Sequence, residues 1–412
     1  MSADSGSAPT ASATWRDSAG FSAVAFAFLI VMAFATLPSP LYGLYRTRDN
    51  LSAFTITLVY AIWAGGTIAA LLAVPAVASR IGRRGVMLTS VATMMASAGL
   101  LAAWKDLAGL LIGRLFTGFA VGLVAGTAFT YLIELRLRQG ANANLARARN
   151  IGTAINVGAL GIGPLVAGCL AEWVRKPLVL PYVLWIALGG LAFVELTIAP
   201  ETGKPTQGAS SAKRPRARVS LPAATATLAA FSANGLFAGL SGLFLATTLH
   251  NHSHALAGTT LFIVFSAGVA AQLATAPLRA SLVLSVGGIS MLVGLALLVT
   301  SVNLSSPSLA LFLISGGLIG AGSGAVFKGT TGIVLEAAAP ENRLAMTAQL
   351  LIALFIGLSI PVIGAGIALD RGVSAPTTVL VFAIAVALGV AASGLQLLTS
   401  EPKAAEQLAS GS

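Results

Sequence analysis

Charged side chains are scarce in this sequence. Only 9% of its 412 residues are Asp, Glu, Lys or Arg, whereas 56% are apolar. Soluble domains carry about 25% charged residues, so a soluble fold of this length could not cover its surface. The mean hydropathy of +0.89 also excludes a disordered chain, because disordered chains are polar and charge-rich. The composition therefore predicts a protein that crosses a lipid bilayer many times.

Cysteine and histidine are also scarce, which limits the kinds of site that can form. Cys169 is the only cysteine, so an intrachain disulfide and a cysteine metal cluster are excluded. The three histidines, His250, His252 and His254, alternate in one short polar segment. This spacing is compatible with a solvated loop, a pH-responsive outer gate or a shared metal. We expect the solvated loop, with no bound metal and no cofactor.

Long apolar runs dominate the sequence. A membrane-spanning helix needs about 20 apolar residues, and these runs are continuous rather than alternating, which favours helices over strands. Twelve runs can be marked, at residues 20–45, 54–78, 85–104, 107–134, 149–171, 179–199, 220–249, 256–278, 281–301, 307–336, 344–368 and 376–398. The sequence therefore predicts an all-α membrane protein with twelve transmembrane helices.

The longest polar stretch divides the twelve runs into two sets of six. It spans residues 200–219 and mixes basic residues with Pro and Ser, a composition that cannot bury apolar surface. We therefore expect an N-terminal six-helix half at 19–199, a cytoplasmic linker at 200–219 and a C-terminal six-helix half at 220–399. Cytoplasmic tails are expected at 1–18 and 400–412.

The basic residues predict the orientation. Of the 24 Lys and Arg residues, 16 fall on the side of the two termini and six on the other side. Cytoplasmic loops carry the excess of basic residues, so both termini should lie in the cytoplasm and the protein in the inner (cytoplasmic) membrane.

The net charge of +11 therefore reflects topology, and we expect no nucleic-acid partner. The polar N-terminus has no basic region followed by a cleavage site, and we expect a retained tail.

A weak internal repeat relates the two halves. Gly118, Gly122 and Glu134 recur as Gly320, Gly324 and Glu336, an offset of 202 residues. Two related sets of six helices are typical of secondary transporters. The sequence has no Walker loop, so ATP is not expected to drive transport directly.

A basic loop follows the second apolar run. It consists of Ser79, Arg80, Ile81, Gly82, Arg83 and Arg84. The arginines could anchor the loop on the cytoplasmic side, or bond carbonyls and carboxylates nearby. The segment resembles the loop signature of the major facilitator superfamily, in which an acidic residue precedes Arg-x-Gly-Arg-Arg. Ser79 holds the acidic position here, so Arg80 and Arg83 would need another carboxylate, for which Glu134 is the candidate.

Arg114 lies about two turns inside the fourth run. A charge at this depth is expensive unless it faces water or a partner, so Arg114 is a functional candidate, and snorkelling to the outer surface is the alternative. The segment from Arg114 to Gly118 resembles the superfamily motif Arg-x-x-x-Gly. The resemblance implies that this arginine takes part in proton coupling.

The fifth run is rich in small residues and contains Pro164. Gly161, Gly163 and Gly168 would let helices approach closely, and proline frees a carbonyl and bends the helix. Helix packing alone could explain this pattern. The series from Gly163 to Gly168 also resembles the antiporter motif of the superfamily, which is typical of exporters.

Few ionisable side chains are embedded in the runs. Glu195 in the sixth run and Glu134 and Glu336 at cytoplasmic helix ends are candidates to carry a proton, although a helix end alone could explain each of them. Lys328 lies eight residues before Glu336 on a similar helix face, so the two could pair and gate the cytoplasmic mouth. Snorkelling of Lys328 is the alternative.

The superfamily resemblance also implies which residues meet the substrate. Spans 1, 4, 7 and 10 line the central cavity in that fold. The lining candidates are Tyr42, Phe116, Thr127, Phe129, Tyr131, Asn234, Phe237 and Lys328. Such an apolar and aromatic wall suits a small lipophilic or neutral molecule.

Together these patterns predict a monomeric secondary active transporter of the major facilitator fold. We expect a proton-coupled exporter that works by alternating access of its two halves. An importer or facilitator on the same fold is the alternative, and a non-transporting membrane sensor is less favoured because no soluble domain is present. A membrane enzyme is also less favoured, because the apolar runs contain no cluster of His, Asp and Glu that could hold a metal or act as acid and base.

Overall fold

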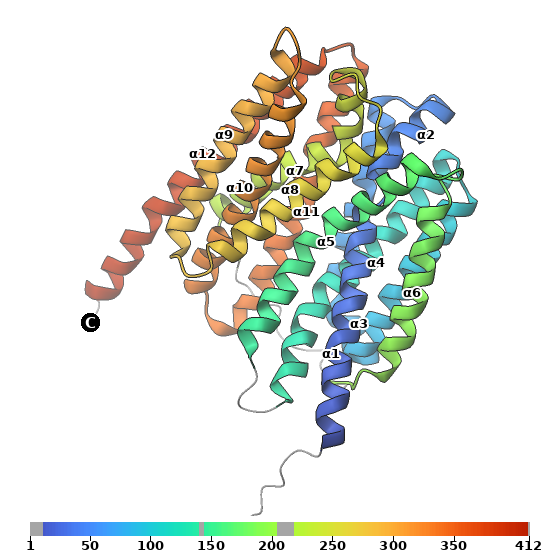
Figure 1. Cartoon of the computed structure of the whole chain (residues 1–412). Helices are drawn as coiled ribbons and strands as arrows, with labels where there is room; N and C mark the ends of the chain where they lie inside the picture. Colours follow the sequence, from blue (N-terminus) through green and yellow to red (C-terminus); the bar gives the residue numbers. More distant parts are fainter. Residues whose placement is uncertain (1–10, 140–143, 204–217, 411–412) are drawn as a thin grey trace, which may run out of the picture.

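The computed structural model describes residues 11–139, 144–203 and 218–410. Most of the expected linker and parts of both expected tails lie outside these residues. Throughout the described ranges the chain forms helices connected by short turns. Figure 1 shows the helices α1 to α6, blue to green, on one side of the molecule, and α7 to α12, yellow to red, on the other.

The first half begins with α1 (Ala11–Thr36), the short turn η1 (Ser39–Leu41) and α2 (Tyr42–Asp49). It continues with α3 (Ala53–Ala103), α4 (Leu107–Leu137), α5 (Leu145–Trp173) and α6 (Leu180–Ile198). The second half contains α7 (Leu221–Thr247), α8 (His254–Ala274), α9 (Ala280–Asn303), α10 (Leu309–Glu336), η2 (Pro340–Asn342), α11 (Arg343–Asp370) and α12 (Ala375–Ser410).

Within the described ranges, eleven helices are long and apolar enough to cross a membrane. They account for the twelve expected runs because α3 holds two of them, 54–78 and 85–104. At about 1.5 Å per residue, its 51 residues extend far beyond the roughly 30 Å of a bilayer core. The helix is interrupted at Gly82, where the backbone has φ +73° and ψ 175°. The expected all-helical membrane fold is confirmed.

The two halves repeat the same close helix packing. Gly118 and Gly122 press α4 against α3, and a Cβ atom at Gly118 would overlap the carbonyl oxygen of Trp63. At the repeat offset, Gly320 and Gly324 press α10 against α8, and a Cβ at Gly320 would overlap the carbonyl of Val264. The weak sequence repeat is thus a repeat of backbone-to-backbone contacts, which only glycine permits.

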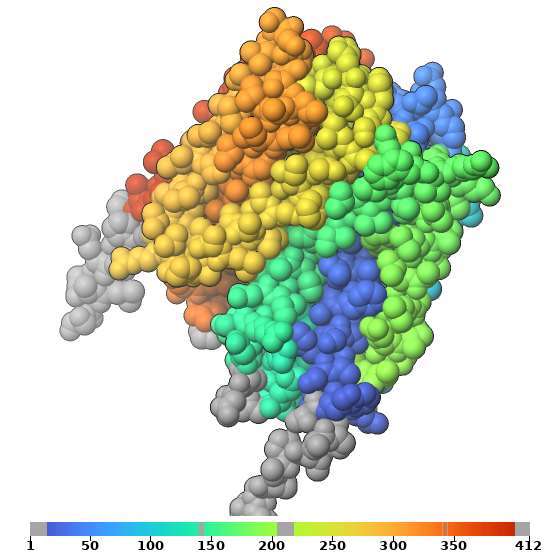
Figure 2. All heavy atoms as spheres, viewed as in Figure 1, coloured from blue at the N-terminus to red at the C-terminus, as the bar shows by residue number. Residues whose placement is uncertain are grey.

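The halves meet along two helix pairs. Helix α5 packs on α8, and α11 packs on the first part of α3. In Figure 2 the yellow surface of α8 lies directly against the green surface of α5. We call the end where α6 stops and α7 starts the linker end of the bundle.

The glycine contact between α3 and α4 generates a prediction. Gly118→Ala should lower the midpoint of thermal unfolding in detergent, because overpacking against a rigid backbone costs about 1–3 kcal/mol. Gly65→Ala on α3 is the matched control, since a Cβ there meets nothing within 4 Å. Circular dichroism on the two purified variants measures both midpoints. Equal midpoints would show that the α3–α4 contact is loose.

Candidate functional site

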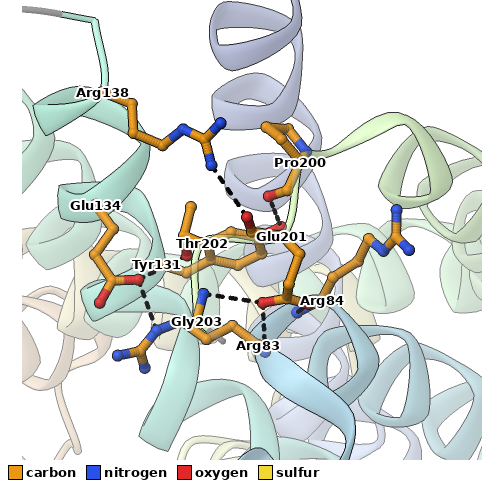
Figure 3. A network of polar contacts seen from close by, with 9 residues as sticks. All are labelled: Arg83, Arg84, Tyr131, Glu134, Arg138, Pro200, Glu201, Thr202 and Gly203. Atoms are coloured by element: carbon orange, nitrogen blue, oxygen red, sulfur yellow. Dashed lines mark hydrogen bonds and ion pairs between the residues drawn. The ribbon is translucent and has the colours of Figure 1, made fainter. Parts of the chain in front are cut away.

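A network of polar contacts at the linker end joins α3, α4 and the segment after α6 (Figure 3). It is organised by the break at Gly82. The positive φ there disfavours any side chain, and a Cβ would lie 2.6 Å from Glu201 Oε2. The break leaves the next backbone N–H groups without helical partners. Arg83 N donates to Glu201 Oε1 (2.9 Å) and Arg84 N donates to Oε2 (3.0 Å). Glu201 therefore caps the second part of α3 from the far end of α6.

Glu134 forms the second centre of this network. Its carboxylate pairs with Arg83, with Nε 2.6 Å from Oε2, and accepts a hydrogen bond from Thr202 Oγ1 (2.6 Å). The expected partnership of Arg83 with Glu134 is present. Arg80, by contrast, is exposed and takes part in none of the ion pairs among the described residues. Ser79 donates only to Ala76 O within its own helix.

Glu201 was missed as a functional candidate in the sequence analysis. It binds the backbone of the loop from a position 122 residues after Ser79. The available signal was the loop itself, which has the arginines of the motif but lacks its acid. The expected cavity residue Tyr131 also lies in this network. It is buried, and its hydroxyl donates to Pro200 O (2.8 Å).

Arg114 is fully buried in α4, with 0% exposure. Helix α1 stops at Thr36 ahead of Pro38, which leaves carbonyls of its last turn without helical partners. Arg114 Nη1 donates to one of them, Ala35 O (2.6 Å), and Nη2 donates to Tyr60 O (3.4 Å). Its guanidinium lies 5.7 Å from the ring centre of Trp63. The side chain is therefore turned into the bundle, and the snorkelling alternative is wrong.

The glycine-rich segment of α5 touches both neighbours of that helix. Pro164 cannot donate to Leu160 O, and Thr36 Oγ1 from α1 bonds this carbonyl instead, at 2.5 Å. A Cβ at Gly163 would overlap Ala33 O on α1, and one at Gly168 would overlap His254 O on α8. The segment is thus packed at the boundary between the halves.

Two carboxylates bridge the halves at the end opposite the linker. Glu172, near the end of α5, accepts hydrogen bonds at the start of α8 from His254 N (2.8 Å) and Ala255 N (3.3 Å). Asp370, the last residue of α11, accepts from Ala53 N (2.9 Å) and Phe54 N (3.0 Å) at the start of α3. Each half supplies one carboxylate and one helix N-terminus. We call these two contacts the crossed caps.

A cavity of about 370 Å³ lies beside the crossed caps, between α2, α7 and the start of α8. Ala53 and His254, whose N–H groups are capped, are both on its wall, together with Tyr42 and Arg46. No group of three His, Cys, Asp or Glu residues in the described part of the chain is placed to hold a metal ion.

The structure separates the expected gating pair. Lys328 Nζ donates to Gln272 O (2.7 Å) and Thr275 Oγ1 (3.3 Å) on α8, so the Lys328–Glu336 interaction is a wrong prediction. Glu336 lies eight residues further along α10, about two turns away, whereas the two oxygen atoms on α8 lie within hydrogen-bond reach of Lys328. Glu336 is exposed and Glu195 half-buried, and neither belongs to an ion pair among the described residues.

Of the other expected cavity residues, three are buried between helices and two are exposed. Asn234 and Ser323 exchange hydrogen bonds between α7 and α10, at 2.9 and 3.1 Å. Phe237 packs on Phe312, and Thr127 is also buried. Phe116 and Phe129 are 41% and 36% exposed.

A family model described as Major Facilitator Superfamily matches residues 24–280, well over half of the chain. The chain belongs to this superfamily. It is therefore a membrane transporter, and the expected superfamily membership is confirmed.

Solved structures agree with this fold. A point mutant of the nucleoside transporter NupG superposes with a TM-score of 0.70 at 11% identity, covering 92% of this chain and 99% of that one. A second NupG structure gives 0.66 at 14% identity, covering 92% and 98%. At these identities the likeness shows the fold alone. No curated protein matches the sequence.

The Glu201 cap leads to a stability prediction. Glu201→Ala should lower the thermal midpoint by a few degrees, because removing a helix cap costs about 0.5–2 kcal/mol. Glu341→Ala is the matched control, since that carboxylate is exposed near the same end of the bundle. Circular dichroism in detergent compares the two variants. A midpoint unchanged in both would show that Arg83 and Arg84 do not need the cap.

The crossed caps predict a conformational effect. Glu172→Ala combined with Asp370→Ala should populate longer distances between spin labels at positions 176 and 305, because both inter-half bridges are lost. Asp106→Ala is the control, since Asp106 caps Gly109 N (2.9 Å) within one half. Double electron–electron resonance in a Cys169→Ser background measures the distances. Identical distributions in all variants would contradict a latching role.

Proposed function

We propose that this protein is a proton-coupled exporter of small lipophilic organic molecules, working by alternating access. The observation that carries the proposal is the boundary between the halves. It combines two bridges that can break, Glu172 to α8 and Asp370 to α3, with close glycine contacts along α5. Such a boundary suits two rigid bodies that rock about a central site.

Export is the direction favoured by the α5 segment. Pro164 and the glycines around it resemble the antiporter motif, and they lie where α5 meets both α1 and α8. Because α5 packs closely on both helices here, it would couple a movement of α8 to α1, the helix that contributes Ala35 O to Arg114. An importer or facilitator on the same fold is the alternative, and it differs in the sign of accumulation.

Proton coupling requires a group that changes its charge during the cycle. Glu134 is our candidate, because its carboxylate holds Arg83 and Thr202 at the linker end. Protonation would weaken its pairing with Arg83 and loosen the network, since an ion pair needs the carboxylate charged. In this proposal the linker end faces the cytoplasm, both termini are cytoplasmic, and one chain is the transport unit in the inner membrane.

Accumulation of lipophilic dyes in cells that lack their own pumps tests this function. Cells with the protein should hold less dye, and a protonophore should remove the difference. Gly168→Val should abolish export, because its side chain would overlap His254 O at the boundary of the halves. Gly190→Val on α6 is the control, since a Cβ there meets nothing within 4 Å. Membrane amounts of both variants are compared on blots.

Each outcome has a distinct meaning. Raised accumulation would overturn export and favour the importer. Lower accumulation that survives the protonophore would overturn proton coupling but retain export. Equal export by both glycine variants would show that the α5 segment is ordinary packing.

A further inference from the structure

Arg114 carries a buried charge that no carboxylate among the described residues balances. The three ion pairs among the described residues are Arg48–Asp49, Arg83–Glu134 and Arg138–Asp17, and none involves Arg114. Its two hydrogen bonds go to neutral backbone carbonyls. A charge inside the membrane region is costly unless a counter-charge or water compensates it.

Several polar atoms near Arg114 also lack a compensating partner, in their case a hydrogen-bond acceptor. Arg114 Nε, Trp63 Nε1, Tyr60 Oη and Tyr42 Oη are buried and have no hydrogen-bond partner within 3.5 Å in the described structure, although the Tyr60 and Trp63 groups lie close enough to interact with each other. The two nitrogen atoms can only donate, and both tyrosine hydroxyls can donate as well. Buried polar groups are normally bonded, so four unpaired groups close together point to an acceptor. The matching ligand atom is an oxygen that carries negative charge.

The four groups lie on a row of aromatic rings that crosses between the halves. Tyr42 and Tyr60 are 6.5 Å apart between ring centres, and Tyr60 and Trp63 are 6.4 Å apart. Trp63 then meets Phe355 of α11 edge to face at 5.5 Å. A ligand on this row would touch both rigid bodies. Its apolar part would have aromatic surface from each half.

The cavity beside the crossed caps reaches the first ring of this row. Tyr42 lines the cavity, is only 4% exposed, and is also the first ring of the row. Ser39, which lines the same cavity, has an unpaired hydroxyl too. The cavity wall includes Arg46, His252 and His254 but neither Asp nor Glu. The carboxylates of Glu172 and Asp370 lie behind this wall, where the N–H groups of His254 and Ala53 hold them. Arg46 is the charged side chain on the wall itself, and a basic side chain there attracts anions.

From these observations we infer that the transported molecule is a small organic anion with an aromatic or other apolar body. Its oxyanion head, in the simplest case a carboxylate, binds Arg114 together with Tyr60 and Trp63. Its apolar body lies against Trp63 and Phe355. The inference rests on the proposed function and narrows its substrate class from lipophilic molecules in general to lipophilic anions.

Matched pairs of acid and amide test the inference. The purified full-length protein is titrated with 2-naphthoate and 2-naphthamide at constant ionic strength, and binding is measured by calorimetry. The two probes have nearly the same shape and differ in charge. We expect 2-naphthoate to bind about tenfold more tightly or better, the effect of one charged hydrogen bond.

Three variants locate the binding. Arg114→Gln should remove the preference for the acid, whereas Arg114→Lys should retain part of it. Tyr60→Phe deletes one unpaired hydroxyl without changing the ring, so it tests the site even if Arg114→Gln fails to fold, and it should weaken acid binding about threefold to tenfold. Tyr45→Phe is the matched control, because the Tyr45 hydroxyl already has a partner in Tyr182 at 3.1 Å. It should leave binding within about twofold.

The outcomes separate this inference from the proposed function. Equal affinity for acid and amide, or acid binding unchanged in folded Arg114→Gln and in Tyr60→Phe, would overturn the inference. Efflux of 2-naphthoate from proteoliposomes under a proton gradient is measured in parallel. Acid-selective binding without efflux would support the anion site and overturn the exporter. Efflux of the amide and the acid alike would support the exporter and overturn the anion site.

Discussion

A backbone group inside a membrane has to find its hydrogen-bond partner within the protein, and this structure depends on that constraint. The helical hydrogen-bond ladder is broken before Pro38, at Pro164 inside α5 and at Gly82, and each of these places leaves carbonyl or N–H groups without helical partners. Side chains from other helices supply the partners. Arg114 bonds Ala35 O, Thr36 bonds Leu160 O, and Glu201 bonds the N–H groups after Gly82. The breaks in the helices thereby become the points at which separate helices are tied together.

These ties lie in the regions to which we assign function. The one at Gly82 fixes the basic loop at the linker end, and the one at Leu160 joins α1 to α5 beside the boundary of the halves. The tie through Arg114 places a cation at the end of α1, against an aromatic row shared with α11. Helix interruptions are tolerated in membrane proteins where they line a cavity or are buried in protein, and transporter folds build their sites from them.

The sequence was sufficient for the fold and for the position of most motifs. Apolar runs show where helices cross, and the recurrence of Gly118 as Gly320 indicated two related halves. Side-chain pairing could not be deduced in the same way. Lys328 and Glu336 share a helix face, yet the carbonyl of Gln272 on another helix lies nearer to the lysine. Glu201 binds the backbone of the basic loop, and only the folded chain brings it to that loop.

The crossed caps have a consequence for how the molecule is built. Because each half contributes one carboxylate and one helix start, the contact is self-complementary, as in an interface with two-fold symmetry. Two copies of a single six-helix unit could make both bridges with one carboxylate and one helix start in each copy. The fused chain has kept that exchange with different acids, Glu172 on one side and Asp370 on the other. It joins its halves as a dimer joins its subunits.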